Sequence, residues 1–565
     1  MNAIRLILAA CLVVACAEAP TTDSAATTEA VDAETAALVA EAGAPLFEGM
    51  GNRHHPITTS HPGAQRYFDQ GMVIAYAFNH AESIRSFQAA QRLDDSCAMC
   101  FWGEALATGP NINVTSNGKA VMTDDERTRA SAALQAAIER KDSATEAERD
   151  YIDALSHRYN GDPSTERAPL DLAYADAMRE LATKYPEDDD AQALFAEALM
   201  NTMPWDYWLD GSNPKPATAE VIAALETVLG RTPDHPLALH LYIHAVEAST
   251  TPDRAEAAAD TLADLIPGAG HLVHMPSHIY WRVGRYHDAA QANVRAAGVD
   301  EAYIAACNAQ GFYPAAYYPH NIHFLWAASS MEGRSAVSIE AARKVAANVR
   351  LEMIEEFPTV EFFHTIPLLA LTQFGRWDDL LAEPQPREDL DFSNAIWHYA
   401  RATALARRGD QQAADAEFEA LVPLLTTDKI MALDGADYPA SAILAVANHL
   451  VQGEIAMAGG DVSNAVKHFE AAVAAQDELP YTEPPFWYYP TRQSLGEALL
   501  ESGDGAAAEA VYRRDLEDYR RNGWSMFGLA QSLEMQGKGE EASEVRAKFE
   551  ELWSLADVKL TASRL

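Results

Sequence analysis

The sequence feature that most constrains the fold is a glycine followed by small and aromatic residues at fixed offsets. Ala465, Phe469 and Ala472 follow Gly460 at offsets of 5, 9 and 12 residues. The pattern recurs, completely or in part, after Gly284, Gly409, Gly503 and Gly537, and a further set is headed by Gly71, with Ser83, Phe87 and Ala90. The steps from Gly375 to Gly409 and from Gly503 to Gly537 are both 34 residues. This period predicts helix–turn–helix units that bury their hydrophobic faces by stacking on one another.

The pattern resembles the tetratricopeptide repeat (TPR) over nearly all of residues 62–555. The resemblance implies an all-α fold, a TPR-like α-solenoid of helical hairpins stacked into a superhelix with a concave groove. Strings such as HLYIHAVEAS and GAGHLVHMPSHIY also resemble a group of bacterial exported TPR proteins of unassigned function. We expect N-terminal TPR-like hairpins over 46–200, histidine-rich central repeats over 201–345, and C-terminal repeats over 346–565.

The N-terminus is typical of an export signal. Residues 1–15 contain one arginine and then a short apolar run, and they end at Cys16 in a sequence that resembles the bacterial lipoprotein box. By that resemblance Cys16 carries a lipid and faces the periplasm, with the outer membrane as its site. The alternative is simple cleavage, which leaves a secreted protein. Residues 16–45 are rich in Ala, Thr and Glu, which predicts a disordered tether.

Charge restricts the partners that this chain can bind. The formal net charge is −41, and a surface this acidic repels phosphate backbones and anionic lipids. We therefore expect no nucleic-acid partner, and membrane contact through the N-terminal lipid only.

Seven histidines are expected on one surface of the central repeats. In TPRs the groove-lining side chains come from the first helix of each hairpin, and Gly284 and Gly333 fix the numbering as turn glycines. The histidines that fall on the groove are His240, His244, His271, His274, His278, His320 and His323, and Glu247 lies on the same stripe as His240 and His244. Pro276 interrupts the central stretch, so a kink or a helix start is expected there.

This cluster predicts a transition-metal site, with copper or zinc as the cofactor. Neutral imidazole suits both metals, and seven histidines exceed the three or four that one ion takes, so two ions or one ion with supporting histidines are expected. Met275 favours copper, although methionine is commonly core filler. Two alternatives stay open. One is a scaffold whose groove binds a peptide or protein without metal. The other is a metal-dependent oxidase or hydrolase, in which Glu247 acts as general base; the cluster is similar in type to paired-copper oxidases.

Other motifs carry weaker expectations. Cys97 and Cys100 form a CxxC that predicts a local disulfide, with a redox dithiol as the alternative, and Cys307 stands alone. The Pro- and aromatic-rich insertion Pro480–Gln493 is expected to cover a repeat edge, or else to fold over the groove or recognise a partner. His54, His55 and His61, just before the first repeat, are either loop residues or additional ligands.

Overall fold

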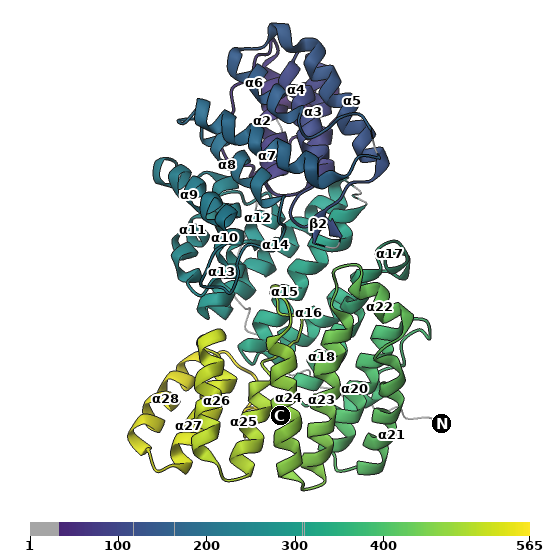
Figure 1. Ribbon diagram of the computed structural model, residues 1–565, viewed down its shortest axis with the longest axis vertical. Helices are drawn as coiled ribbons and strands as arrows, with labels where there is room; N and C mark the ends of the chain where they lie inside the picture. Colours follow the sequence, from purple (N-terminus) through teal and green to yellow (C-terminus); the bar gives the residue numbers. More distant parts are fainter. Residues whose placement is uncertain (1–32, 117, 163, 308, 310) are drawn as a thin grey trace, which may run out of the picture.

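The computed structural model describes residues 33–565 except 117, 163, 308 and 310, and it is built of helices (Figure 1). A two-stranded antiparallel pair, β1 (Thr115–Ser116) and β2 (Lys119–Ala120), is the only sheet in this part of the chain. The predicted signal peptide and Cys16 lie outside the described residues. The end of the predicted tether 16–45 departs from expectation, because α1 (Ala33–Ala42) forms there and Ala42 is buried. No helix among the described residues is long and apolar enough to cross a membrane.

Consecutive helices pair along the array. The N-terminal half contains α2 (Pro62–Tyr76), α3 (His80–Leu93), α4 (Ala98–Thr108), α5 (Asp124–Arg140), α6 (Glu146–Leu155), α7 (Arg167–Lys184), α8 (Asp189–Met200), α9 (Pro216–Arg231), α10 (Pro236–Val246), α11 (Glu256–Leu262), α12 (Gly270–His274), α13 (Pro276–Val283) and α14 (Tyr286–Cys307). Helix α2 packs on α3, α8 on α9, and α12 and α13 on α14.

The C-terminal half continues the array. It contains α15 (Tyr318–Met331), α16 (Ser335–Asn348), α17 (Leu351–Glu356), α18 (Ile366–Gln373), α19 (Trp377–Ala382), α20 (Asp391–Arg407), α21 (Gln411–Leu421), α22 (Asp428–Asp434), α23 (Ala440–Ala458), α24 (Val462–Asp477), α25 (Arg492–Glu501), α26 (Gly505–Asp518), α27 (Gly523–Met535) and α28 (Gly539–Leu552). The first helices of successive hairpins also touch, α15 on α18, α18 on α20 and α20 on α23. The all-α, TPR-like solenoid is thereby confirmed.

The turn glycines agree with the sequence register. Left-handed φ angles of 62–83° occur at Gly284, Gly333, Gly375, Gly409, Gly460, Gly503 and Gly537. Each follows the first helix of a hairpin, where a residue with a Cβ atom is strained. Gly71 differs from this set, because it lies inside α2 against the Phe87 ring. The residue five before Ser83 is Phe78, and its φ of 56° shows that a phenylalanine occupies the turn position of that unit.

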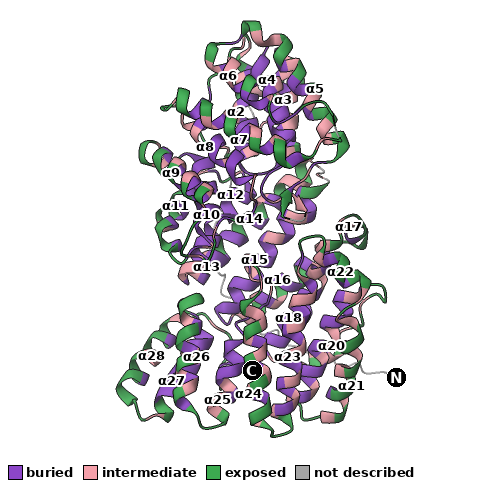
Figure 2. Ribbon diagram, viewed as in Figure 1, coloured by how far each residue is buried: buried purple, intermediate pink, exposed green. Residues whose placement is uncertain are grey.

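Two long-range contacts shape the array around its middle. Helix α10 packs against α2. The N-terminal half therefore curls until the hairpin that begins with α10 contacts the first hairpin, α2 and α3. In the C-terminal half, the segment after α28 packs back on the inner helices: Leu560 and Arg564 are buried, and the Arg564 guanidinium lies 3.7 Å from the Tyr489 ring centroid. We call the first helix of each hairpin the inner helix and the second the outer helix. Figure 2 shows buried residues along the inner helices and exposed ones on the outer helices.

Candidate metal centre

The clustered histidines come from inner helices of three consecutive hairpins. His240 and His244 lie on α10, His271 on α12, His278 on α13, and His320 on α15. Pro276 separates α12 from α13, as expected from its missing N–H. Met275 nevertheless keeps helical angles (φ −50°, ψ −38°), so the backbone stays helical from α12 into α13. The histidines before Pro276 therefore belong to a helix and not to an approach loop.

The histidines are buried rather than exposed on an open groove, which corrects the groove-facing prediction. His240, His244, His271, His274 and His278 are 0–2% exposed, and His320 is half-buried. TPR position numbers report which face of the hairpin a residue occupies, but they do not report what covers that face. The sequence therefore predicted an open surface. Here that face is covered by α2 from the first hairpin and by the insertion Pro480–Gln493.

The first group consists of His240, His244 and His271, each of which offers a ring nitrogen within 4.8 Å of the others. His240 Nδ1 lies 2.6 Å from the Tyr76 carbonyl oxygen, and His244 Nδ1 lies 2.7 Å from Glu247 Oε1. A carbonyl or a carboxylate only accepts, so both Nδ1 atoms carry the proton and both Nε2 atoms keep a free lone pair. Neither Nε2 atom has a hydrogen-bond partner, and neither ring nitrogen of His271 has one.

The second group consists of His274, His278 and His320. His274 Nδ1 lies 2.6 Å from Asn293 Oδ1, and His278 Nδ1 lies 2.6 Å from Glu247 Oε2. His274 Nε2 then faces His278 Nε2 at 2.8 Å and His320 Nε2 at 3.2 Å. The Nδ1 partners again leave lone pairs on the Nε2 atoms of His274 and His278. With both rings neutral, two acceptors face each other at hydrogen-bond distance, and only a proton or a metal ion between them removes their repulsion.

Glu247 connects the two groups. Its carboxylate is fully buried and accepts from one histidine of each group, His244 and His278. Burial acts to raise the pKa of this carboxyl, but the charge of His278 and the hydrogen bonds from both imidazoles outweigh it and hold the pKa below its usual value. Glu247 is thus placed as an anionic acceptor that orients two rings, with both oxygens engaged.

Burial keeps most of these imidazoles neutral. It is the largest cause that lowers the pKa values of His240, His244, His271, His274 and His320, and nearby histidines lower them further. Neutral imidazole is the form that binds a metal ion, so protons compete weakly for these nitrogen atoms at neutral pH.

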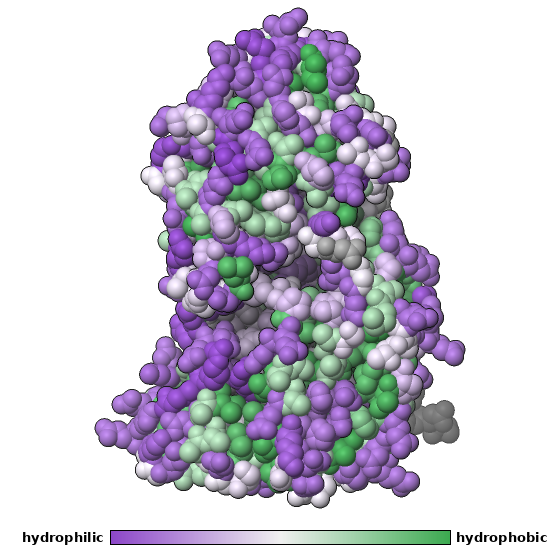
Figure 3. Space-filling view, viewed as in Figure 1, coloured by the Kyte–Doolittle hydropathy of each residue, from purple (hydrophilic) through white to green (hydrophobic). Residues whose placement is uncertain are grey.

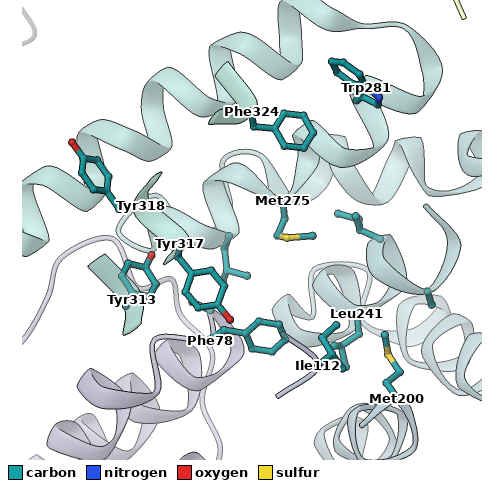
Figure 4. Packing of buried hydrophobic residues seen from close by; sticks show 14 of the residues in the cluster. Phe78, Ile112, Met200, Leu241, Met275, Trp281, Tyr313, Tyr317, Tyr318 and Phe324 are labelled. Carbon is teal, nitrogen blue, oxygen red and sulfur yellow. The ribbon is translucent and has the colours of Figure 1, made fainter. Parts of the chain in front are cut away.

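Aromatic rings lie against both groups, and Figure 4 shows two of these residues, Phe78 and Phe324. Phe78 lies 4.4 Å from the His240 ring and 5.6 Å from the His271 ring, and Phe324 lies 5.2 Å from His274 and 5.1 Å from His278, centroid to centroid. Trp205 lies 5.2 Å from the His244 ring. Phe78 and Trp205 are two of the four non-glycine residues with positive φ in the described chain, at 56° and 62°. Backbone strain of this kind concentrates at functional sites.

His323 and Met275 lie apart from the two groups. The His323 ring stacks on Trp326 at 5.1 Å and meets Phe362 and Phe363 edge-on, and it belongs to none of the described sets of potential ligands. Burial lowers its pKa to about 3. Met275 is buried in the hydrophobic cluster shown in Figure 4, so it packs as core and gives no support for copper.

The insertion Pro480–Gln493 reaches the site. Glu483 Oε2 lies 3.6 Å from His278 Nδ1, and Glu483 also accepts from the Tyr481 hydroxyl and lies near Arg282. Burial, and next the charge of Glu247, raise the pKa of Glu483 well above its usual value. Of the three roles expected for this segment, its contact with His278 agrees with folding over the groove. Figure 3 shows that the face in view is hollowed near its middle.

The remaining motif residues have local partners. Cys97 and Cys100 form a close pair with Cα atoms 5.4 Å apart, a separation that a disulfide spans. His55 Nδ1 lies 2.8 Å from the buried Asp190, and His54 Nδ1 lies 2.8 Å from Asp69. His61 caps α2 through Gly63 N–H. These three histidines therefore lie outside the two groups.

Sequence reasoning missed the residues that orient and cover the histidines. Asn293 and the Tyr76 carbonyl each hold an Nδ1 atom, and no local motif distinguishes them. Phe78 had a usable signal: counting back the repeat offsets from Ser83 and Phe87 leads to it as the turn residue.

No protein-family model and no curated protein sequence matches the chain. Solved structures with distant similarity include the human IFIT1 dimer with m7Gppp-AAAA (14% identity, 76% of this chain and 87% of that chain, TM-score 0.31). Others are Cut9 in the APC/C Cut9–Hcn1 hetero-tetramer (11%, 86% and 87%, 0.26) and the P58(IPK) TPR domain (11%, 85% and 99%, 0.22). Scores this low carry no argument about the site, which rests on the chain's own contacts.

Proposed function

We propose that this protein binds two transition-metal ions, one at His240, His244 and His271 and one at His274, His278 and His320. The observation that carries the proposal is the convergence of imidazole Nε2 atoms. In four of the rings, a hydrogen bond at Nδ1 fixes the tautomer that leaves the Nε2 lone pair free. Metal-binding histidines characteristically donate their other N–H to a carboxylate or carbonyl. His240, His244 and His278 each have such an acceptor, and His274 has the Asn293 amide oxygen.

Within the protein itself, several of these buried nitrogen atoms have no hydrogen-bond partner. A buried polar group without a partner costs about 1–3 kcal/mol, and the first group alone contains four such nitrogen atoms. In the second group, the 2.8 Å approach of two Nε2 atoms is repulsive for neutral rings unless a proton or a metal ion lies between them. A cation bound by one nitrogen of each ring satisfies three of the four atoms of the first group and removes the repulsion in the second, whereas a peptide in a groove does not reach these atoms.

We propose copper as the first metal to test, with zinc as the alternative. All six ligand atoms are imidazole nitrogens, and aromatic rings lie against both groups. Transferring charge into such an apolar site is costly, so a monovalent cuprous ion is favoured over a divalent one. Zinc binds three histidines with an open fourth position equally well by ligand type, and Glu247 offers one compensating charge. Bound copper supplies redox chemistry, and bound zinc supplies Lewis acidity.

Elemental analysis of variants tests the proposal. The full chain, purified without a histidine tag, should retain two equivalents of copper or zinc after dialysis against a weak chelator. His271→Phe and His320→Phe should each lose one equivalent. His323→Phe is the matched control, because it removes a buried histidine of the same repeats outside both groups, and it should retain two.

The outcomes separate the competing functions. A wild-type chain that takes up neither copper nor zinc overturns the metal proposal and leaves the peptide-binding scaffold, for which partner capture is the next experiment. Equal metal loss in His323→Phe also counts against it, since the loss then reflects folding. An oxidase or hydrolase requires, in addition, an activity that follows the metal content of these variants.

We further propose that the chain is an exported lipoprotein, anchored through Cys16 and facing the periplasm. The support is the sequence of residues 1–16, together with the Cys97–Cys100 pair, which suits an oxidising compartment. Mass spectrometry of the mature N-terminus tests this. A lipid on Cys16 supports it, an unmodified N-terminus after cleavage indicates secretion, and an uncleaved Met1 overturns export.

A further inference from the structure

A cavity of about 170 Å³ adjoins the second histidine group. It lies between α15, α18, α20, α23 and the insertion Pro480–Gln493. Most of its wall is apolar, and much of that is aromatic, with the rings of Trp326, Phe362, Phe392, Tyr438, Phe486 and Trp487. An engineered protein cavity of about 150 Å³ lined by apolar residues holds one benzene molecule, so this space has the size of a single-ring ligand.

One part of the wall is polar. His320 and Glu483 line the cavity, so it reaches both a ligand candidate of the second group and the carboxyl that lies against His278. Three buried polar atoms of the lining residues have no hydrogen-bond partner: Trp326 Nε1, Trp487 Nε1 and Glu483 Oε2. Their residues are 2–4% exposed. Buried groups of this kind are normally satisfied, so a ligand of this cavity is expected to pair with them.

The chemistry of these atoms defines the ligand. An indole N–H only donates, so it requires an acceptor, while a carboxyl oxygen pairs with a hydroxyl group in either protonation state. Among the functional groups of an organic ligand, a hydroxyl group serves both roles. We propose that the cavity is a binding site for a small, uncharged aromatic molecule with one ring and one hydroxyl group, such as a phenol. A role for this ligand beside a bound metal ion rests on the proposed function. The cavity and its unpaired atoms are independent of that proposal.

Other ligand classes fit less well. A carboxylate ligand would lie against Glu483 with Glu247 behind it, which is unfavourable. A quaternary ammonium ion suits aromatic walls, but it accepts no hydrogen bond from the two indoles. An extended peptide exceeds the volume.

Calorimetric titration of the full chain, in metal-free and metal-loaded forms, tests the proposal. Phenol should bind the metal-free form about fivefold or more tightly than toluene, which matches one neutral hydrogen bond. Benzoate and choline should bind weakly. Toluene binding equal to phenol, or choline binding more tightly than phenol, overturns the proposal.

Matched variants locate the binding. Trp326→Phe and Trp487→Phe keep a ring and remove the N–H, so each should reduce the preference for phenol over toluene. Trp524→Phe is the control, because its buried indole already donates to the Ser330 carbonyl at 3.0 Å and lies outside the cavity. Ile443→Trp fills the cavity and should abolish binding, and an unchanged phenol affinity in this variant overturns the proposal.

Metal content is measured on the same samples and separates the two proposals. Phenol binding by a chain that takes up no metal supports the cavity and removes the metal centre. Two equivalents of metal with no phenol binding support the centre and remove the ligand.

Discussion

Replacement of Glu247 by glutamine is the most informative single change to the proposed centre. The carboxylate accepts from His244 Nδ1 at 2.7 Å and from His278 Nδ1 at 2.6 Å. An amide keeps one accepting oxygen, and its NH2 group then faces the second N–H donor. That imidazole is driven to the other tautomer, which puts the proton on Nε2, the atom proposed to bind the metal.

The size of the effect follows from one lost charge-assisted hydrogen bond. Such a bond contributes about 1.5–3 kcal/mol, and each 1.4 kcal/mol is tenfold in affinity. We therefore expect Glu247→Gln to weaken one of the two ions by about 10- to 100-fold, and the other by less, since the amide still orients one ring. Chelator competition on the copper- or zinc-loaded protein measures both affinities.

Glu148→Gln is the control for this experiment. Glu148 is also buried, 5% exposed, accepts from the Thr58 and Thr145 backbone N–H groups, and belongs to neither histidine group. This variant should keep wild-type affinity for both ions. Wild-type affinity in Glu247→Gln as well would refute the reasoning that the carboxylate fixes the tautomers.

Two further predictions concern stability. Burial lowers the pKa of His323 to about 3 from an ordinary value near 6.5, so below pH 6.5 the unfolded chain binds a proton that the folded chain does not. As the pH falls from 6.5 towards 3, the wild type should therefore lose stability relative to His323→Phe by about 1.4 kcal/mol per pH unit. Urea unfolding measures this difference, and parallel pH profiles for the two proteins would contradict the prediction. A Cβ atom on Gly453 would lie 2.3 Å from the Phe469 ring, so Gly453→Ala should destabilise by about 1–3 kcal/mol, whereas Gly298→Ala, with nothing within 4 Å in α14, should be neutral or stabilising.

The repeat register accounts for what the sequence predicted. Because turn glycines such as Gly284 and Gly333 adopt left-handed angles, counting from them gives the correct face of each inner helix. Six of the seven histidines selected in this way lie together. His323 shares the inner helix α15 with His320 but points to the cavity side, among Trp326 and Phe362.

The cover of the site was beyond such reasoning. Which residue meets His240 depends on how far the superhelix curls before α10 returns to α2, and this curl sums small rotations over several hairpins. The approach of Glu483 to His278 depends likewise on the curvature of the C-terminal half. Burial, and with it the pKa values, follows from those long-range contacts rather than from the local pattern.

The covering of the histidines by distant segments has a consequence for how this solenoid folds and moves. In an ordinary repeat array each unit contacts only its neighbours, so folding can start at any unit and the curvature of the array can vary. Here Phe78 and Glu483, separated by about four hundred residues, both contact imidazoles at the centre. These contacts close long loops, which slows folding, and they couple units that would otherwise open independently. The array should therefore unfold in one cooperative transition and keep a fixed superhelical pitch. The contacts at the histidine cluster should hold its two halves together.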